Sequence, residues 1–150
     1  MKLFQNLFAK DNSIEIGAPA AGKLVSIKEV SDPTFSEEVL GKGAAIIPAD
    51  GKFYAPAAGT VSTIFPTGHA AAITSSEGVE ILIHIGLDTV KLEGKHFTIH
   101  ASEGQEVKKG DLLLEWYGTL EGVFEPGRRR MWLRISDARL HFRKRAIIGC

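Results

Sequence analysis

The sequence predicts an all-β sandwich or barrel, and two observations support this fold class. From Ile14 onward, short segments of alternating apolar and polar residues are separated by glycine and proline, at the spacing typical of such folds. In addition, the near repeats GAPAAG at 17–22 and YAPAAG at 54–59 each precede an alternating segment, at 23–27 and 60–64. This weak internal duplication indicates two similar sheet halves.

The first 13 residues are predicted to be an amphipathic tail that precedes the β-rich core. Leu3, Phe4, Leu7 and Phe8 recur at helical spacing, which is typical of a short helix at a membrane interface. Such a short helix binds membranes weakly, and a frayed chain end is the alternative. We therefore expect no more than weak contact with a membrane surface through the N-terminus.

Two further segments have recognisable local patterns. Residues 32–41, DPTFSEEVLG, are typical of a helical turn that presents Phe35, Val39 and Leu40 together. Residues 104–115, GQEVKKGDLLLE, predict a tight turn that leads into a strand. The core is therefore predicted to hold short helical turns between its strands.

The segment from His69 to His84 is predicted to be a β-hairpin. Its flanks are apolar and rich in β-branched residues, and its middle, SSEG at 75–78, is a turn signal. A loop of two or four residues centred on Ser76 and Glu77 pairs residues whose numbers sum to 153, so that His69 stands opposite His84. We therefore expect both imidazoles on one face, with Cβ atoms roughly 4.5–5.5 Å apart. This arrangement suits two groups that act on one small anion or metal ion.

Alternation along the hairpin predicts which side chains share the histidine face. The buried set of the second strand comprises Val79, Ile81, Ile83 and Ile85. The opposite face then holds Glu80, Leu82 and His84, together with Thr67, His69 and Ala71 from the first strand. Two unrelated polar residues on a solvated face are the alternative, which the proximity of Thr67 and Asp88 disfavours.

Composition indicates one soluble, globular domain. The chain has 150 residues, zero formal net charge and 44% hydrophobic residues, which is enough to bury a core. No apolar segment approaches the roughly 18 residues of a membrane span, and the N-terminus lacks the pattern of a signal peptide. Cys150 is the only cysteine, so no internal disulfide is expected and a cytoplasmic location is favoured.

The zero net charge conceals a difference between two parts of the chain. Residues 1–116 contain ten lysines, no arginine and fifteen acidic residues, whereas residues 117–150 contain seven arginines, one lysine and three acidic residues. Three interpretations stay open for the later segment. It is a natural basic extension, a tail that binds nucleic acid or membranes, or a segment translated in a shifted reading frame.

Five motifs occur in an order that matches a known family. They are DPTFSEEVLGKG at 32–43, FPTGH at 65–69, VEILIHIGLDTV at 79–90, LEGKHF at 92–97 and GQEVKKGDLLLE at 104–115. Together they resemble the glucose-type enzyme IIA of the bacterial phosphoenolpyruvate-dependent sugar phosphotransferase system. The resemblance covers about residues 14–115 and implies an antiparallel β-sandwich of the barrel-sandwich type, with jelly-roll or Greek-key features. The short N-terminal segment resembles the free-standing form of the family.

The resemblance also implies roles for individual residues. His84 would accept a phosphoryl group from the phosphohistidine of the carrier HPr and pass it to a cysteine of enzyme IIB, ahead of sugar uptake by the IIB/IIC permease. His69 corresponds to the accessory histidine and Thr67 to the threonine that orients it, while Asp32 and Asp88 match acidic residues beside the site. The apolar rim for partner proteins corresponds to Phe35, Val39, Leu40, Phe65 and Leu82.

No cofactor is required by this resemblance. It allows zinc to bridge His69 and His84 where a partner supplies another ligand, and it allows regulatory proteins as further partners. The domain core is accordingly expected at 14–116, between the N-terminal tail at 1–13 and a divergent basic segment at 117–150.

Two other protein classes share part of the pattern. HIGLD at 84–88 fits the H-x-G-x-D zinc motif of lysostaphin-type peptidases, with His69 as a third ligand, but those enzymes need an H-x-H element, and His96 and His100 are four residues apart. VKKGDLL at 107–113 is typical of biotinyl or lipoyl carriers, but no lysine stands at a matching hairpin tip. Both alternatives are therefore disfavoured.

After Glu115 the resemblance fades. Residues 117–150 show no counterpart of the family's final strands, and together with the change from lysine to arginine this favours an aberrant or frameshifted tail. An inactive variant is then the alternative function. If the missing strands complete the sandwich, the tail must fill the gap or leave strand edges exposed. A nucleic-acid partner is not expected, although the basic tail keeps that alternative open.

Overall fold

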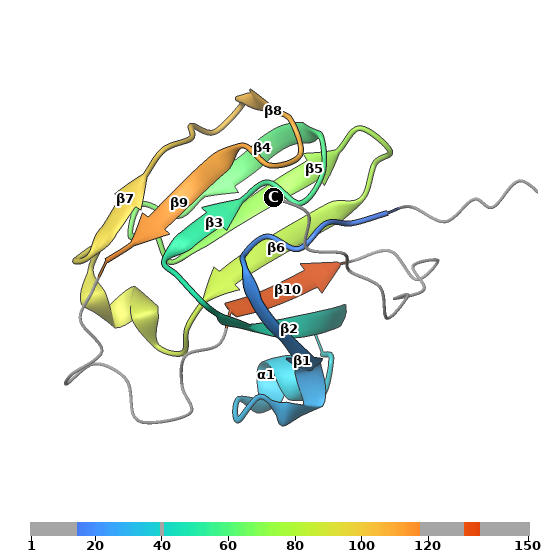
Figure 1. Cartoon of the computed structure of the whole chain (residues 1–150), viewed down its shortest axis with the longest axis vertical. Helices are drawn as coiled ribbons and strands as arrows, with labels where there is room; N and C mark the ends of the chain where they lie inside the picture. The colour runs from blue at the N-terminus through green and yellow to red at the C-terminus, as the bar shows by residue number, and fades with distance from the viewer. Residues whose placement is uncertain (1–14, 40, 118–130, 136–150) are drawn as a thin grey trace, which may run out of the picture.

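The larger of two antiparallel sheets organises this chain, whose structure is a computed structural model. It describes residues 15–39, 41–117 and 131–135, the last five as backbone only (Figure 1). Within these residues the larger sheet has seven strands, in the spatial order β1 (Gly22–Ser26), β2 (Lys42–Pro48), β10 (Met131–Ile135), β6 (Glu80–Ile85), β5 (Ala70–Ser75), β4 (Gly59–Ile64) and β8 (Glu106–Val107). The smaller sheet has three, in the order β3 (Lys52–Tyr54), β9 (Leu112–Trp116) and β7 (Phe97–Ile99). The predicted antiparallel β-sandwich is confirmed.

Short helical segments connect the strands at two places near one end of the larger sheet. They are the 3₁₀ turn η1 (Ile27–Glu29), the single-turn helix α1 (Pro33–Ser36) and the 3₁₀ turn η2 (Thr89–Leu92). None of the helical segments among the described residues has the length and hydropathy of a membrane span.

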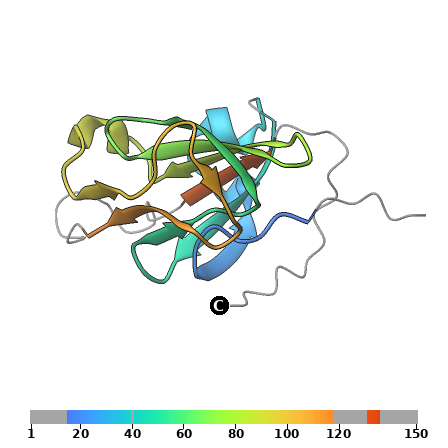
Figure 2. The same ribbon diagram turned by 90° about the horizontal axis from the view of Figure 1, so that it is seen from above.

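The core lies between the two sheets. Figure 2 shows the smaller sheet as a layer against part of the larger one, and β3 and β9 contribute the fully buried Phe53, Leu113 and Leu114. They face the isoleucines of β5 and β6, of which Ile73 and Ile83 are both 0% exposed. Burial of each such side chain stabilises the fold by roughly 1.5–3 kcal/mol.

The two near repeats lie side by side in the fold. The N–H of Gly17 donates to the carbonyl of Pro56 at 2.8 Å, and the N–H of Tyr54 donates to the carbonyl of Pro19 at 2.7 Å. The proline of each repeat has no N–H of its own, but its carbonyl accepts from the other repeat. The strands that follow, β1 and β4, then diverge toward opposite ends of the larger sheet.

The β5–β6 hairpin forms as predicted, but its predicted register is wrong by one residue. The N–H of Ser75 donates to the carbonyl of Val79 at 2.8 Å, and the N–H of Gly78 donates to that of Ser75 at 2.9 Å. These bonds close a loop of three residues, in which Gly78 has a left-handed φ of +81°. Three-residue hairpin loops take this form with glycine at the left-handed position.

The three-residue loop moves the partner of His84 by one position. Ala70 stands opposite His84 in the observed ladder, and Ala71 stands opposite Ile83. Ala71 was expected on the histidine face, but it is fully buried. The signal SSEG is compatible with loops of two, three or four residues, so that the sequence pattern alone does not decide among them.

We predict that Gly78→Ala destabilises the hairpin. No atom lies within 4 Å of the position of an added Cβ, so the cost arises only from the left-handed backbone and amounts to about 1–2 kcal/mol. Chemical denaturation at neutral pH measures it, with Glu77→Ala in the same exposed loop as the control. Equal stability of the two variants would contradict the left-handed assignment of Gly78.

Candidate functional site

His84 lies on the face of β6 that points away from the core. Ile81, Ile83 and Ile85 are 1%, 0% and 5% exposed, and they alternate with Leu82 and His84, which are half-buried. The predicted division of β6 into a buried face and a histidine face is therefore confirmed. The strand ends at Ile85, one residue after His84, and the following Gly86 adopts a φ of +71°.

His69 reaches His84 although the two residues are not a cross-strand pair. It lies just before β5, after a left-handed Gly68 with a φ of +69°, and its carbonyl accepts from the N–H of Ile85 at 2.8 Å. Because it precedes the regular strand, its side chain is not bound to the alternation of β5. The two imidazole centroids lie 5.2 Å apart at an interplanar angle of 80°.

Thr67 orients the His69 ring. Its Oγ1 lies 2.5 Å from Nδ1 of His69, and the ring is buried, with 7% of the residue exposed. This burial lowers the pKa of His69 below its usual value of 6.5. The hydrogen bond and the low pKa together describe a fixed, uncharged imidazole near neutral pH.

Two phenylalanines pack against the histidine pair. The Phe35 ring lies 5.1 Å from the His84 ring, and the Phe65 ring lies 5.2 Å from the His69 ring, both as centroid distances. Phe65 remains 39% exposed. The pair is therefore enclosed by aromatic surface on both sides and remains close to solvent.

Phe35 reaches the site because α1 is capped and anchored. Oδ1 of Asp32 accepts from the N–H of Thr34 at 2.9 Å, and Pro33 occupies the first turn, which is a favourable start for a helix. Phe35 also packs against the small cluster formed by Ile27, Val30, Ala45, Val25 and Leu87.

The predicted helical turn at 32–41 is shorter than expected. Helix α1 ends at Ser36, Glu38 has a left-handed φ of +54°, and Val39 is 70% exposed. Val39 therefore lies outside α1, beyond the left-handed Glu38, and its place in the partner-binding surface beside Phe35 stays a prediction. Leu40 lies outside the described residues.

The electrostatic environment of His84 strongly disfavours its charged form. Burial, followed by the neighbouring His69, lowers the pKa of His84 to about 4, while the Gly86 backbone and Asp32 act in the opposite direction. Nδ1 of His84 is buried and has no full hydrogen bond to the described residues. The Gly86 backbone therefore acts on the His84 imidazole as a weak electrostatic partner and not through a full hydrogen bond.

The two predicted acidic residues are placed differently. Asp32 raises the pKa of His84, whereas Asp88 lies 3.3 Å from Nζ of Lys91 in an ion pair whose side chains are 61% and 75% exposed. Asp88 also has a left-handed φ of +57° and makes no side-chain cap to η2. Its role beside the histidines stays a prediction, and Asp32 is the carboxylate that faces His84 electrostatically.

Thr89, which the sequence motifs did not single out, supports the turn that follows His84. Thr89 is 2% exposed, and its hydroxyl donates to the carbonyl of Ile85. This bond secures the turn that follows His84. The only signal in the sequence is a threonine within this turn. Because many exposed threonines occur in similar turns, this signal does not identify Thr89 as buried.

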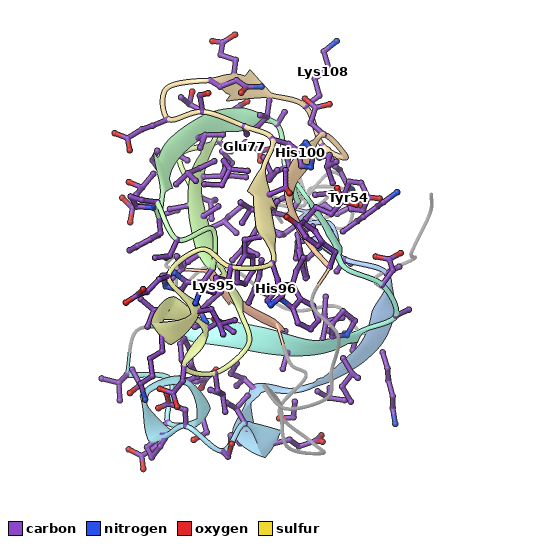
Figure 3. The ribbon with its side chains drawn as sticks, turned by 90° about the vertical axis from the view of Figure 1, so that its left-hand side faces the viewer. Tyr54, Glu77, Lys95, His96, His100 and Lys108 are labelled. Carbon is purple, nitrogen blue, oxygen red and sulfur yellow. The ribbon has the colours of Figure 1, made fainter. Side chains whose placement is uncertain are left out.

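Two other histidines among the described residues, His96 and His100, do not join the pair. His96 and His100 lie at the two ends of β7 (Figure 3), where His100 contacts a carboxylate oxygen of Glu115 at 3.1 Å and His96 contacts the Tyr117 ring edge-on. The described residues contain no group of three or more His, Cys, Asp or Glu able to hold a metal ion. The zinc centre of a lysostaphin-type peptidase therefore does not assemble within them.

We predict that the wild type loses stability relative to His84→Gln as the pH falls from 6.5 to about 4. The unfolded chain binds a proton on this histidine near pH 6.5, whereas the folded chain does so only at about 4. Protons therefore favour the unfolded state within this window, by up to about 3 kcal/mol. Chemical denaturation of both proteins at several pH values measures the effect, and a constant difference between them would contradict it.

We also predict that Asp32→Asn lowers the pKa of His84, while Asp88→Asn leaves it unchanged. The carboxylate of Asp32 stabilises the imidazolium form, and asparagine keeps the helix cap, so the fold is retained. NMR titration of the His84 ring protons measures the pKa in each variant. A larger decrease in Asp88→Asn than in Asp32→Asn would show that the wrong carboxylate has been assigned.

Comparison with known proteins identifies the family of most of this chain. Residues 14–120 match the sequence model of the phosphoenolpyruvate-dependent sugar phosphotransferase system, EIIA 1. The chain is 50% identical over 105 residues to the glucose-specific EIICBA component of Streptococcus pneumoniae serotype 4, and 49% identical over 102 residues to the beta-glucoside-specific EIIBCA component of Halalkalibacterium halodurans. These matches cover 70% and 68% of this chain but only 14% and 16% of the two relatives.

A solved structure supports the same assignment. The glucose permease IIA from Mycoplasma capricolum superimposes with a TM-score of 0.67 at 45% identity, over 69% of this chain and 67% of that one. The family match at 14–120 contains both histidines, the two phenylalanines and Thr67. This chain belongs to the EIIA 1 family of the phosphoenolpyruvate-dependent sugar phosphotransferase system.

Proposed function

We propose that this chain is a phosphocarrier in sugar uptake, in which His84 accepts a phosphoryl group from the phosphohistidine of HPr and passes it to a cysteine of enzyme IIB. The observation that carries the proposal is the pair of uncharged imidazoles, with ring centroids 5.2 Å apart. Membership of the EIIA 1 family supports it. The names of the relatives, one glucose-specific and one beta-glucoside-specific, leave the sugar open.

The low pKa of His84 suits a group that both accepts and releases phosphate. An uncharged imidazole nitrogen has a free electron pair near pH 7, so it is available as a nucleophile. Because Nδ1 is buried, Nε2 is the nitrogen that we assign as the acceptor. In the transfer, the N–P bond of the donor breaks while a bond forms between phosphorus and Nε2, and the proton of His84 stays on Nδ1.

His69 and Thr67 would stabilise the transferring group. Phosphoryl transfer builds charge on the phosphoryl oxygens, so fixed hydrogen-bond donors around them lower the barrier. If the Thr67 hydroxyl donates to Nδ1 of His69, the proton of His69 resides on Nε2, where it is available to such an oxygen. The contact between Oγ1 and Nδ1 fits this tautomer, which is part of the proposal.

The two carboxylates would keep the transfer reversible. A negative charge near a phosphorylated imidazole repels the phosphoryl group, which favours its release to the next carrier. Asp32 is the acidic residue that interacts with His84, so we assign it the larger share of this repulsion. Asp88, which forms a solvent-exposed ion pair with Lys91, would contribute less.

The surface around the histidines would receive several partners in turn. Phe35, Phe65 and Leu82 provide apolar area beside the histidines, the exposed Val39 stays a predicted part of this surface, and apolar patches with polar rims are typical of docking sites. HPr, enzyme IIB with its IIC permease, and regulatory proteins are the partners that we assign to it. This places the chain in the cytoplasm as part of the same proposal.

A metal ion would need a ligand from such a partner. Structural zinc takes four protein ligands, and His69 and His84 would supply only two of them. Zinc bridging at a partner interface therefore stays a proposal that depends on the partner.

The proposal predicts labelling of one histidine. Incubation with phosphoenolpyruvate, enzyme I and HPr should give acid-labile phosphate on the wild type and none on His84→Gln, because the acceptor nitrogen is removed. His100→Gln, which alters a histidine outside the site, should be labelled like the wild type. Absence of label on wild-type protein with a cooperative unfolding transition would refute the assignment and leave an inactive variant.

A further inference from the structure

The larger sheet is continuous only because β10 lies between β2 and β6. Figure 1 shows β10 in orange-red between these two strands, and it pairs antiparallel with both of them. This strand belongs to residues 117–150, beyond the family match at 14–120. A segment outside the family match therefore occupies the middle of the sheet that carries the candidate site.

The hydrogen bonds of the β5–β6 hairpin show which residues of β6 face β10. The N–H of Ser75 donates to Val79, and the N–H of Ile85 donates to His69. Residues of an antiparallel strand alternate between its two neighbours, so the odd-numbered residues of β6 bond to β5. The backbone groups of Leu82 and His84 therefore point to β10, where the register places Arg134 and Trp132.

The hydrogen bonds between β1 and β2 likewise show which residues of β2 face β10. The N–H of Ala49 donates to the carbonyl of Ala21 at 2.8 Å, in line with the β1–β2 ladder. The odd-numbered residues of β2 therefore bond to β1, and the backbone groups of Ala44 and Ile46 point to β10.

Strand β10 divides its backbone hydrogen bonds between β2 and β6. Leu133 and Met131 stand opposite Ala44 and Ile46, whereas Trp132 and Arg134 were assigned to β6 from the hairpin. Successive residues of β10 thus bond alternately to β2 and to β6, as a regular central strand requires. Without β10, the residues of β2 and β6 that face it would leave their N–H and C=O groups unpaired inside the sheet.

This strand also separates the two halves of the candidate site. Asp32 and Phe35 lie in the connection between β1 and β2, whereas His69 and His84 lie in and beside the β5–β6 hairpin. Neighbouring strands of a sheet lie about 4.8 Å apart, so β10 increases the distance between β2 and β6 by about this amount. The contact of Phe35 with His84, at 5.1 Å between centroids, therefore depends on β10 holding β2 and β6 at the correct separation.

We propose that Met131–Ile135 is a positioning strand of the phosphoryl-acceptor site, which acts through its backbone pairing with His84 and with β2. The inference rests on the proposed function for its effect on phosphoryl transfer, but its structural part is independent of that function. Trp132 is the central position, because its backbone groups pair with those of His84 itself.

Amide hydrogen exchange on the full wild-type chain tests the structural part without any mutation. The amides of Ala44, Ile46, Leu82 and His84 should be protected to a similar degree as those of Ile83 and Ile85, which bond to β5. Exchange of the first four at least about 100-fold faster than that of Ile83 and Ile85 would show that β10 does not pair there, and would overturn the inference.

A proline series tests the effect on the site. Trp132→Pro removes the N–H that faces His84, and proline is not tolerated in a central strand, so phosphorylation of His84 by phospho-HPr should slow by at least about tenfold. Trp132→Val keeps the N–H and should be labelled within about twofold of the wild type. Arg128→Pro, three residues before the strand, is the matched control and should also be labelled like the wild type.

The outcomes separate this inference from the proposed function. Protected amides with no labelling of any protein would contradict the phosphocarrier function and leave the strand in place. Normal labelling of Trp132→Pro would overturn the positioning role. If Trp132→Pro fails to fold, the hydrogen exchange of the wild type still decides whether β10 pairs with His84.

Discussion

Burial of one face of β6 is the constraint that places the rest of the site. Ile81 and Ile83 pack against Phe53, Leu113 and Leu114 of the smaller sheet. A slip of one residue would exchange these isoleucines with Leu82 and His84 and bring an imidazole into the core. The apolar core therefore specifies the outward direction of His84, and the hairpin, the turn at Gly86 and the approach of His69 all follow from that direction.

The same packing determines the chemistry of the histidines. Phe35 and Phe65 enclose the pair, and the resulting loss of hydration lowers the pKa of both rings. Two imidazoles at 5.2 Å would also repel each other if both were charged. The site is thus built to hold two uncharged rings beside each other, with Asp32 as a partial counterweight at His84. Because the apolar face of β6 is buried in the core, the opposite face carries His84, whose imidazole is weakly basic.

The two halves of this site are joined by β10, a strand that comes from the divergent C-terminal segment. The arginine-containing segment was expected to leave strand edges exposed unless it filled a gap, and β10 does lie in the gap between β2 and β6. Its pattern, MWLRI, consists mainly of residues that favour strands. Backbone pairing makes few demands on side-chain identity, which explains how a segment unlike the family's own can complete the sheet. Whether the segment is a natural extension or arose by a shifted reading frame is a separate question from its place in the fold.

The sequence by itself determined the fold class, the buried isoleucine face and the two histidines, because these follow from local alternation and from motifs that lie within single segments. It did not determine the hairpin register, since SSEG suits loops of several lengths and only the left-handed Gly78 selects three residues. The tertiary structure also decided that Phe35 contacts His84, that Asp32 acts on the pKa of His84, and that β10 separates β2 from β6. These contacts join segments distant in sequence, and their geometry depends on how the sheets and the α1 connection pack, which no local pattern specifies.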